Sequence, residues 1–271
     1  MMRRLLLILF ISVGYFTTLT AGTECHREMS CEEERVERRP IKSEYTAEWG
    51  WTRYKSTYLS PLPYSGHGIA LAGRWSKVFN HFDGKANMAF DARITLAETL
   101  NPAKTAAMDG ATVDLGWGLA WHPHISSNWD FTLGGRIGIY AGALYLTRNS
   151  NNPVTAIAAP GLDITASTAY SFHIGRLPIS ISDHISIPSL SIFFCPQFGE
   201  TYYEIYLGNR KGLVHCGWWG NAAAADNHLQ AKLHFGRRAM LLGWHLEYRS
   251  WNANHISTSI RQSSLTIGLE F

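Results

Sequence analysis

Hydrophobic residues recur at every second position through most of this chain. In the segment 111–122, threonine, aspartate, glycine, alanine and histidine separate Val113, Leu115, Trp117, Leu119 and Trp121. Because successive side chains of a β-strand point to opposite faces, this pattern predicts strands with one apolar and one polar face. Segments 86–99 and 129–146 repeat the pattern. We therefore expect an all-β fold.

The beginning of the chain is typical of an exported protein. Arg3 and Arg4 precede an apolar run from Leu5 to about Phe16, and small residues follow. This arrangement predicts a secretory signal peptide over residues 1–22, cleaved near Ala21–Gly22. No later segment reaches the roughly 18 consecutive apolar residues of a membrane-spanning helix. Entry into a membrane would therefore require a closed β-barrel.

A soluble β-sandwich would alternate in the same way, but three features favour a membrane barrel. The strands are long, their polar faces are rich in glycine and alanine, and tryptophans stand near strand ends, where lipid meets water. We predict a monomeric, transmembrane, antiparallel up-and-down β-barrel, surrounded by lipid in the cell outer membrane.

Counting the alternating segments predicts about ten strands, or twelve if residues 195–225 add a hairpin. The predicted segments are roughly 45–58, 66–79, 86–99, 111–122, 129–146, 157–173, 178–194, 227–236, 239–252 and 257–271. The charged residues 23–44 are interpreted as a periplasmic lead segment before a barrel over 45–271. Short connections alternate with longer ones, the longest at about 188–226. This alternation predicts periplasmic termini and extracellular long loops.

Two stretches carry resemblances to known proteins. The last strand, "SSLTIGLEF", ends on Phe271 and resembles the C-terminal signal that the barrel insertion machinery reads in bacterial outer-membrane proteins. The stretch "PQFGETYYEI", followed by "LGN" and His215, resembles a family of uncharacterised outer-membrane barrels of Bacteroides-like bacteria. This second resemblance implies fold and location. It implies no activity and no catalytic residues.

Ionisable residues recur on the polar faces, which should line the barrel. A narrow interior removes such charges from water, so we expect them to pair with one another. A selective polar pathway is the alternative. The predicted lumen set is Asp91, Arg93, Asp114, Asp130, Arg136, Asp163, His184, Lys232, His245, Glu247 and Arg249.

The long loop combines aromatic and carboxylate side chains, as a carbohydrate or lipid-headgroup site would. The candidate ligand residues are Glu200, Tyr202, Tyr203, Glu204, His215 and Trp218. The loop could equally be a plug packed by its own aromatics. Of three possible cysteine pairings, we favour Cys25 with Cys31 and Cys195 with Cys216.

A His-x-Ser triplet, which could supply a base and a nucleophile, occurs at His124–Ser126, His184–Ser186 and His255–Ser257. Its repetition weakens the signal, so we expect no catalytic residues. No zinc spacing or nucleotide fingerprint predicts a metal or cofactor. The formal charge of +3 is too small to indicate nucleic-acid binding.

The sequence thus favours a non-enzymatic outer-membrane barrel with a role in surface binding or envelope structure. One alternative is a narrow pore for small solutes. Another is a lipid-modifying hydrolase that uses a His-x-Ser pair.

Overall fold

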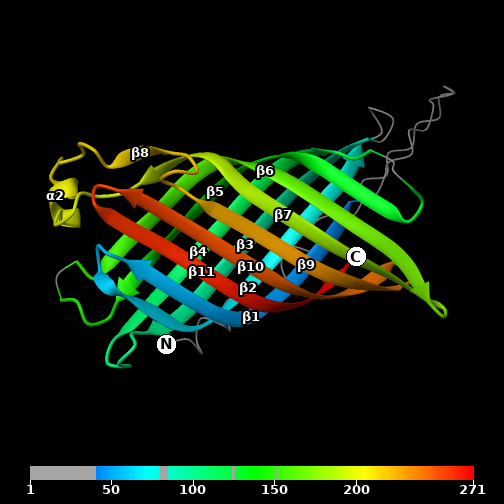
Figure 1. The fold of residues 1–271 in the computed structure, drawn as a ribbon, viewed down its shortest axis with the longest axis horizontal. Coiled ribbons are helices and arrows are strands. Elements are labelled where there is room, and N and C mark those ends of the chain that lie inside the picture. Colours follow the sequence, from blue (N-terminus) through cyan, green and yellow to red (C-terminus); the bar gives the residue numbers. More distant parts are fainter. Residues whose placement is uncertain (1–40, 80–84, 124–125, 151) are drawn as a thin grey trace, which may run out of the picture. The chain divides into compact units, whose positions relative to one another are not determined.

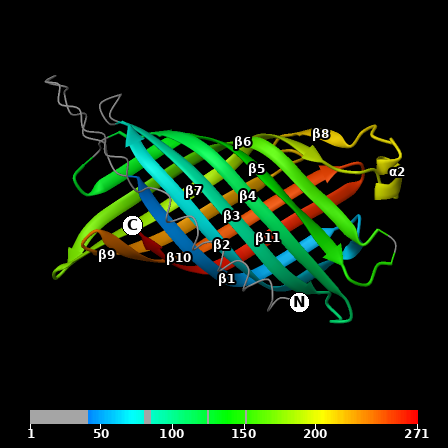
Figure 2. The same ribbon diagram turned by 180° about the vertical axis from the view of Figure 1, so that it is seen from behind.

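The computed structural model describes residues 41–79, 85–123, 126–150 and 152–271, which form a closed antiparallel β-barrel (Figures 1 and 2). Each barrel strand pairs with its neighbours in sequence, and β1 closes the ring against β11. The ten barrel strands are β1 (Lys42–Ser56), β2 (Ser60–Phe79), β3 (Ala86–Leu100), β4 (Ala107–Trp121), β5 (Trp129–Leu146), β6 (Val154–Ile174), β7 (Leu177–Phe194), β9 (Ala224–Phe235), β10 (Arg238–Ala253) and β11 (Ile256–Glu270). The predicted fold class and strand number are confirmed.

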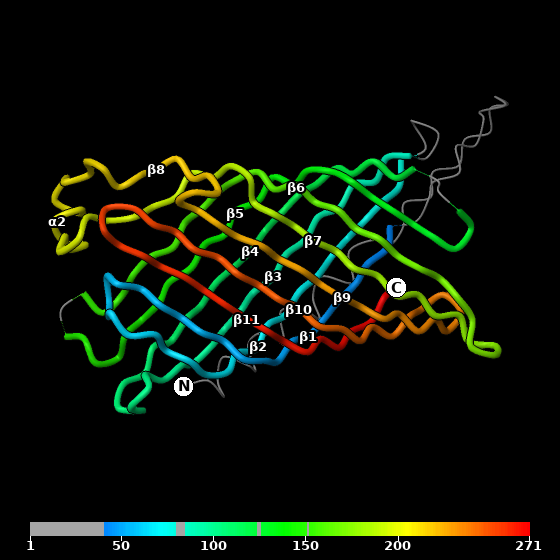
Figure 3. The backbone as a smooth tube through the Cα atoms, viewed as in Figure 1, coloured from blue at the N-terminus to red at the C-terminus, as the bar shows by residue number. Residues whose placement is uncertain are grey.

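The long connection between β7 and β9 contains two short elements, α2 (Tyr202–Tyr206) and β8 (Val214–Gly217). Among the described residues, β8 pairs only with the last residues of β7. It lies beside the end of that strand and is not one of the barrel strands. Figure 3 shows this connection at the end of the barrel opposite the C-terminus. We name this end the loop end, and the end with the C-terminus the turn end.

Two connections at the loop end are much shorter than the sequence predicted. Only residues 57–59 separate β1 from β2, because β2 extends back through Pro61 and Pro63. Residues 61–63 have no paired partner in β1, so these prolines remove no hydrogen bond from the ladder. Asn254 and His255 alone join β10 to β11. Both have positive φ, which a type I′ hairpin turn requires.

The predicted signal peptide, most of the predicted lead segment, Cys25 and Cys31 lie outside the described residues. β1 begins at Lys42, three residues before its predicted start. Barrel strands range from 12 residues in β9 to 21 in β6. All exceed the roughly ten residues that cross a bilayer, so part of the barrel extends beyond a membrane.

The outer surface of the turn-end half is apolar. We name this region the apolar belt, and its side chains are all more than one third exposed. The belt comprises Trp49, Trp51, Leu71, Phe90, Ile94, Leu115, Trp117, Leu119, Trp121, Trp129, Leu133, Ile137, Ile139, Leu162, Ile164, Ile181, Ile185, Leu229, Leu242, Trp244, Leu246, Leu265, Ile267, Leu269 and Phe271. The belt is interrupted on β7 and β9 by an outward pair, in which Asn227 donates to Asp183 at 2.7 Å. Elsewhere it matches the lipid-facing band of a membrane barrel.

Toward the loop end, the interior becomes apolar, and on β1 the outer face becomes charged. Along β1 the inward residues change from Glu48 to Tyr54, while the outward residues change from Trp51 to Arg53. The expectation of a polar inner face along whole strands is therefore wrong for the loop-end half. Where the outer surface meets water, an antiparallel barrel gains stability from an apolar interior.

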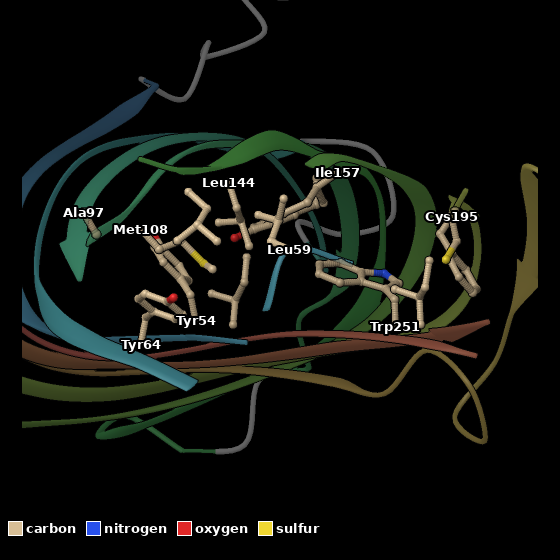
Figure 4. Close-up of a cluster of buried hydrophobic side chains, with 14 of the residues drawn as sticks. Tyr54, Leu59, Tyr64, Ala97, Met108, Leu144, Ile157, Cys195 and Trp251 are labelled. Atoms are coloured by element: carbon tan, nitrogen blue, oxygen red, sulfur yellow. The ribbon is translucent and has the colours of Figure 1, made fainter. Parts of the chain in front are cut away.

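The loop-end interior is filled by buried hydrophobic side chains, which we name the apolar cluster (Figure 4). Each member is at most 8% exposed. The cluster comprises Tyr54, Leu59, Tyr64, Ala97, Ala106, Met108, Tyr140, Leu144, Leu146, Ile157, Phe193, Cys195, Ala222, Trp251, Ile256 and Ile260. Because these residues come mainly from the barrel strands, the loop-end half has a core like that of a soluble β-protein.

Candidate functional site: a polar cavity beneath an ionic layer

Arg93 of β3 anchors one side of a charged layer inside the barrel. Its Nε and Nη2 donate to the two carboxylate oxygens of Glu48 at 3.1 and 2.9 Å. Its Nη1 donates to Glu247 at 2.6 Å. Glu48 and Glu247 come from β1 and β10, so a single guanidinium ties three strands together.

Arg136 of β5 anchors the other side with three carboxylates. Its guanidinium donates to Asp91 at 2.9 and 2.6 Å, to Asp114 at 2.5 Å and to Asp163 at 2.7 Å. The side chain lies against Gly116 of β4, where an added Cβ would stand 1.9 Å from the Arg136 Nε. Glycine at this position is therefore what leaves room for the guanidinium.

Arg249 of β10 joins the two sides. Its Nε donates to Glu247 at 2.8 Å and its Nη2 to Asp114 at 2.6 Å, while the guanidinium lies 4.1 Å from the centre of the Tyr140 ring. We name Arg93, Arg136, Arg249 and their carboxylate partners the ionic layer. Buried charges cost several kcal/mol each when unpaired, so these reciprocal bonds hold the layer together.

A row of histidines lies on the turn-end side of this layer. His184 of β7, His228 of β9 and His245 of β10 stand directly opposite one another in the strand register. His245 bonds Glu48 at 3.0 Å through Nδ1 and Asp226 at 2.9 Å through Nε2. Nearer the turn end, the Lys232 ammonium donates to Glu44 at 2.5 Å and to Glu270 at 2.8 Å.

A cavity of about 660 Å³ occupies the turn-end half of the barrel. Its lining includes Val78, His122 and His234, which lie at the turn-end limits of their strands, so the cavity reaches that end. One wall, from β6 and β7, is neutral and presents serine hydroxyls, including those of Ser167 and Ser182. Among the described residues, no phenylalanine, tyrosine or tryptophan lines the cavity.

Several polar groups of the cavity lack a partner in the described part of the protein. Buried polar atoms without a hydrogen bond include Asn87 Oδ1, His184 Nδ1 and Gln230 Nε2. Arg74 also lines the cavity, opposite Glu44 and Asp91 in the strand register, and its guanidinium forms no hydrogen bond with a described residue. Buried polar groups are normally satisfied, so these atoms are available to water or to a polar solute.

On the loop-end side of the ionic layer the interior is nearly full. A second cavity, between Arg136, Arg249, Tyr140 and Trp251, measures about 20 Å³. This is room for about one water molecule. The ionic layer and the apolar cluster therefore close the barrel on the loop-end side of the large cavity.

The structure places the predicted lumen residues on the inner face of the barrel. Seven belong to the ionic layer: Asp91, Arg93, Asp114, Arg136, Asp163, Glu247 and Arg249. His184, Lys232 and His245 line the cavity, as does Asp130, which bonds His122 near the turn end.

Sequence reasoning missed Glu48, Asp226, Glu44 and Glu270 as members of this network. Glu48 lies four residues before Thr52 in β1 and therefore on the same inward face, so the period of two could have predicted that it faces the interior. Asp226 was assigned to the long loop, but β9 begins at Ala224 and places Asp226 in phase with His228. An earlier start for this strand would have revealed it.

The six candidate ligand residues of the long loop do not share one pocket. Neither cavity described above includes any of them. Glu200 is buried, and its carboxylate accepts from the Asn209 side chain at 2.7 Å and from the Gln197 backbone N–H at 2.9 Å. The Tyr202 hydroxyl accepts from the Ala156 amide at 2.7 Å.

Of the other four candidate ligand residues, two make contacts at the loop end and two are exposed. Glu204 caps α2, where bonds from the Thr201 amide and hydroxyl lower its pKa. The His215 ring lies 5.5 Å from that of Phe193. Tyr203 and Trp218 are 68% and 61% exposed.

Cys195 and Cys216 are both free thiols in this structure, contrary to the favoured pairing. Cys216 stands opposite Ile192, three residues from Cys195 along the paired strands. An odd offset of three puts the two side chains on opposite faces, roughly 10 Å apart along the strand, beyond disulfide reach. Burial raises the pKa of Cys195 to about 11.

None of the described His-x-Ser triplets forms a histidine–serine hydrogen bond. Ser186 donates to Asp163 at 3.4 Å, and the Nδ1 of His184 has no hydrogen-bond partner among the described residues. His255 occupies the β10–β11 turn. His124 lies outside the described residues.

Within the described ranges, no group of three or more His, Cys, Asp or Glu is arranged to hold a metal ion. No described helix is long and apolar enough to cross a membrane.

The fold and its interior define a closed ten-stranded antiparallel β-barrel with an apolar belt. The chain belongs to the family described as "Protein of unknown function (DUF3316)", which matches residues 5–270. The predicted membership of a family without assigned activity is thus supported, whereas the Bacteroides-like origin and the "PQFGETYYEI" signature stay predictions. No curated protein matches the chain.

Solved structures with a similar fold include outer-membrane proteins. The outer membrane protease OmpT of Escherichia coli is 8% identical, with a TM-score of 0.47 over 85% of this chain and 96% of that one. The transport unit of the autotransporter AIDA-I of Escherichia coli is 9% identical, with a TM-score of 0.43 over 90% and 93%. The translocator domain of NalP of Neisseria meningitidis is 7% identical, with a TM-score of 0.40 over 88% and 90%.

Proposed function

We propose that this protein is a non-enzymatic outer-membrane barrel that binds a small polar solute in its turn-end cavity without conducting it across the membrane. The turn end faces the periplasm in this proposal, because the one long connection, between β7 and β9, leaves the barrel at the opposite end. One observation carries the proposal: the 660 Å³ cavity reaches the turn end, while the ionic layer and the apolar cluster close the other side.

The chemistry of the cavity indicates the class of solute. The described lining has no phenylalanine, tyrosine or tryptophan and so does not suit an apolar molecule, whereas its serine hydroxyls and unpartnered polar atoms suit a hydrophilic one. Arg74 stands opposite Glu44 and Asp91 in the strand register, yet its guanidinium forms no hydrogen bond with a described residue, so its donors are open to a solute. We therefore expect a solute that carries an anionic group beside hydroxyl or amide groups.

Cysteine accessibility tests this arrangement. In a variant with the four native cysteines replaced by serine, Ser182→Cys introduces a thiol into the cavity and Thr99→Cys a thiol on the inner face of the loop-end half. A charged thiol reagent should label Ser182→Cys in the folded barrel and leave Thr99→Cys unmodified. Equal labelling of both, or of neither, would contradict the proposed cavity. Solutes that slow labelling of Ser182→Cys, and fail to do so after Arg74→Gln, identify the ligand.

Conductance in a planar bilayer separates this function from a pore. The intact protein should be silent. A variant without residues 198–211 should also be silent, because the barrier consists mainly of strand residues. Steady discrete conductance of the intact protein would instead establish the narrow-pore alternative.

A further inference from the structure

Three cations stand on the outer surface immediately beyond the apolar belt. Along β1 the outward residues run from Trp49 and Trp51 to Arg53 and Lys55. Along β11 they run from Leu265 through Ser263 to Arg261. The cations therefore lie on the loop-end side of the belt, at the level where lipid headgroups would surround an inserted barrel.

Arg53 and Arg261 face each other directly in the register of β1 and β11. Like charges directly opposite on neighbouring strands destabilise a sheet. The remaining register partners of these cations are neutral: Ser65 opposite Arg53, Tyr248 opposite Arg261 and Ser259 opposite Lys55. The repulsion is therefore not relieved by a cross-strand carboxylate.

No described residue forms a salt bridge with any of the three cations. Among the described residues, the Arg261 guanidinium lies 5.2 Å from the centre of the Tyr248 ring. Outward carboxylates do occur, but Glu98 and Asp109 face each other on β3 and β4 instead of pairing with the arginines. The outer surface thus keeps an uncompensated positive patch, which we name the basic patch: Arg53, Lys55 and Arg261.

An anion held between the two guanidinium groups would turn their repulsion into attraction. Guanidinium groups bind phosphate oxygens through paired, charge-assisted hydrogen bonds, and the lysine adds a third positive charge. The basic patch borders the apolar belt, where Trp49 and Trp51 are exposed. A lipid can place its acyl chains against these tryptophans while its headgroup phosphate meets the arginines, which free phosphate cannot do. We propose that the basic patch binds the phosphate of an anionic lipid headgroup in the leaflet nearest the loop end. This site rests on the proposed membrane insertion and is independent of the solute cavity.

The test compares Arg53→Gln/Arg261→Gln with a control pair, Arg148→Gln/Arg210→Gln, which removes two exposed arginines from loop-end connections. Each full-length mature protein is refolded into phosphatidylcholine vesicles, alone or with phosphatidic acid, which carries a phosphate monoester. Native mass spectrometry measures retained phosphatidic acid, and gel mobility before and after heating measures the melting of the folded barrel.

Wild type and the control pair should retain phosphatidic acid and melt at a higher temperature in its presence. Arg53→Gln/Arg261→Gln should bind it at least about tenfold more weakly, as the loss of one good charged contact predicts, and should lose the thermal shift. Arg53→Lys/Arg261→Lys should recover part of both. Equal lipid dependence of Arg53→Gln/Arg261→Gln and wild type would overturn the proposal.

Two further outcomes are distinguishable. If inorganic phosphate, added to phosphatidylcholine vesicles, raises the melting temperature of wild type as much as phosphatidic acid does, the site takes free phosphate and the lipid assignment is wrong. If wild type does not fold into phosphatidylcholine at all, membrane insertion itself fails, which is a separate result from loss of the phosphate site.

Discussion

At the scale of single residues, the ionic layer depends on small side chains as much as on charges. Gly116 and Gly138 flank Arg136, and a Cβ on either would stand within 2.5 Å of its guanidinium nitrogens. Gly135, in the same strand as Arg136, has only ordinary van der Waals space around its missing Cβ. Glycines that look alike in the sequence therefore have different roles.

We expect Gly116→Ala to destabilise the barrel and Gly135→Ala to leave it nearly unchanged. Displacing Arg136 would cost about 1–3 kcal/mol, as overpacking of a filled interior does. Urea titrations in lipid vesicles, followed by tryptophan fluorescence, would measure both. Equal destabilisation by the two substitutions would contradict this account of Gly116.

Breaking the ionic layer from one side should be costly. Arg249→Met leaves the buried Asp114 and Glu247 each with one partner fewer, so we expect a loss of about 3–5 kcal/mol. Asp130→Asn removes an exposed carboxylate from His122 and should cost about 1 kcal/mol or less. The same titrations would compare the two, and similar losses would argue against a tightly coupled layer.

At the scale of elements, the segment between β7 and β9 covers the loop end without closing the barrel by itself. Its ends contribute Cys195 and Ala222 to the apolar cluster, while α2 and β8 are largely exposed. The register between β7 and β8 keeps the two thiols apart, because Cys216 of β8 pairs with Ile192 and so faces away from Cys195.

This register predicts different reactivities for the two thiols. In a Cys25→Ser/Cys31→Ser variant at pH 8, a thiol reagent should modify the exposed Cys216 quickly and the buried Cys195 only after unfolding. The raised pKa of Cys195, about 11, keeps that thiol protonated until the pH approaches 11. Mass spectrometry of labelled peptides would measure both rates, and a Cys195–Cys216 disulfide would contradict the prediction.

At the scale of the whole molecule, the interior of the barrel differs between its two halves. The turn-end half is apolar outside and polar inside, whereas the loop-end half has an apolar interior. This change of interior is expected if lipid surrounds the first half and water surrounds most of the second.

Arginine substitutions on one face of β5 test this division. Ile137→Arg, in the apolar belt, should destabilise the inserted barrel by about 2–4 kcal/mol, as charges near a bilayer midplane do. Tyr145→Arg lies outward near the loop end of the same strand and should cost about 1 kcal/mol or less. Equal costs, measured by urea unfolding in vesicles, would contradict the position of the membrane.

The sequence by itself determined the period of two, and with it the ten strands, the outward tryptophans and the inward phase of residues such as Arg93, Arg136 and Arg249. These follow from local geometry, since alternation needs no knowledge of neighbouring strands. Tertiary structure decided which charges meet, because Arg93 reaches Glu48 and Glu247 only after β1 and β10 come together around the ring. It also decided that the interior closes toward the loop end. That closure depends on inward residues of many strands reaching the same level, and strand register sets that level only when the barrel closes.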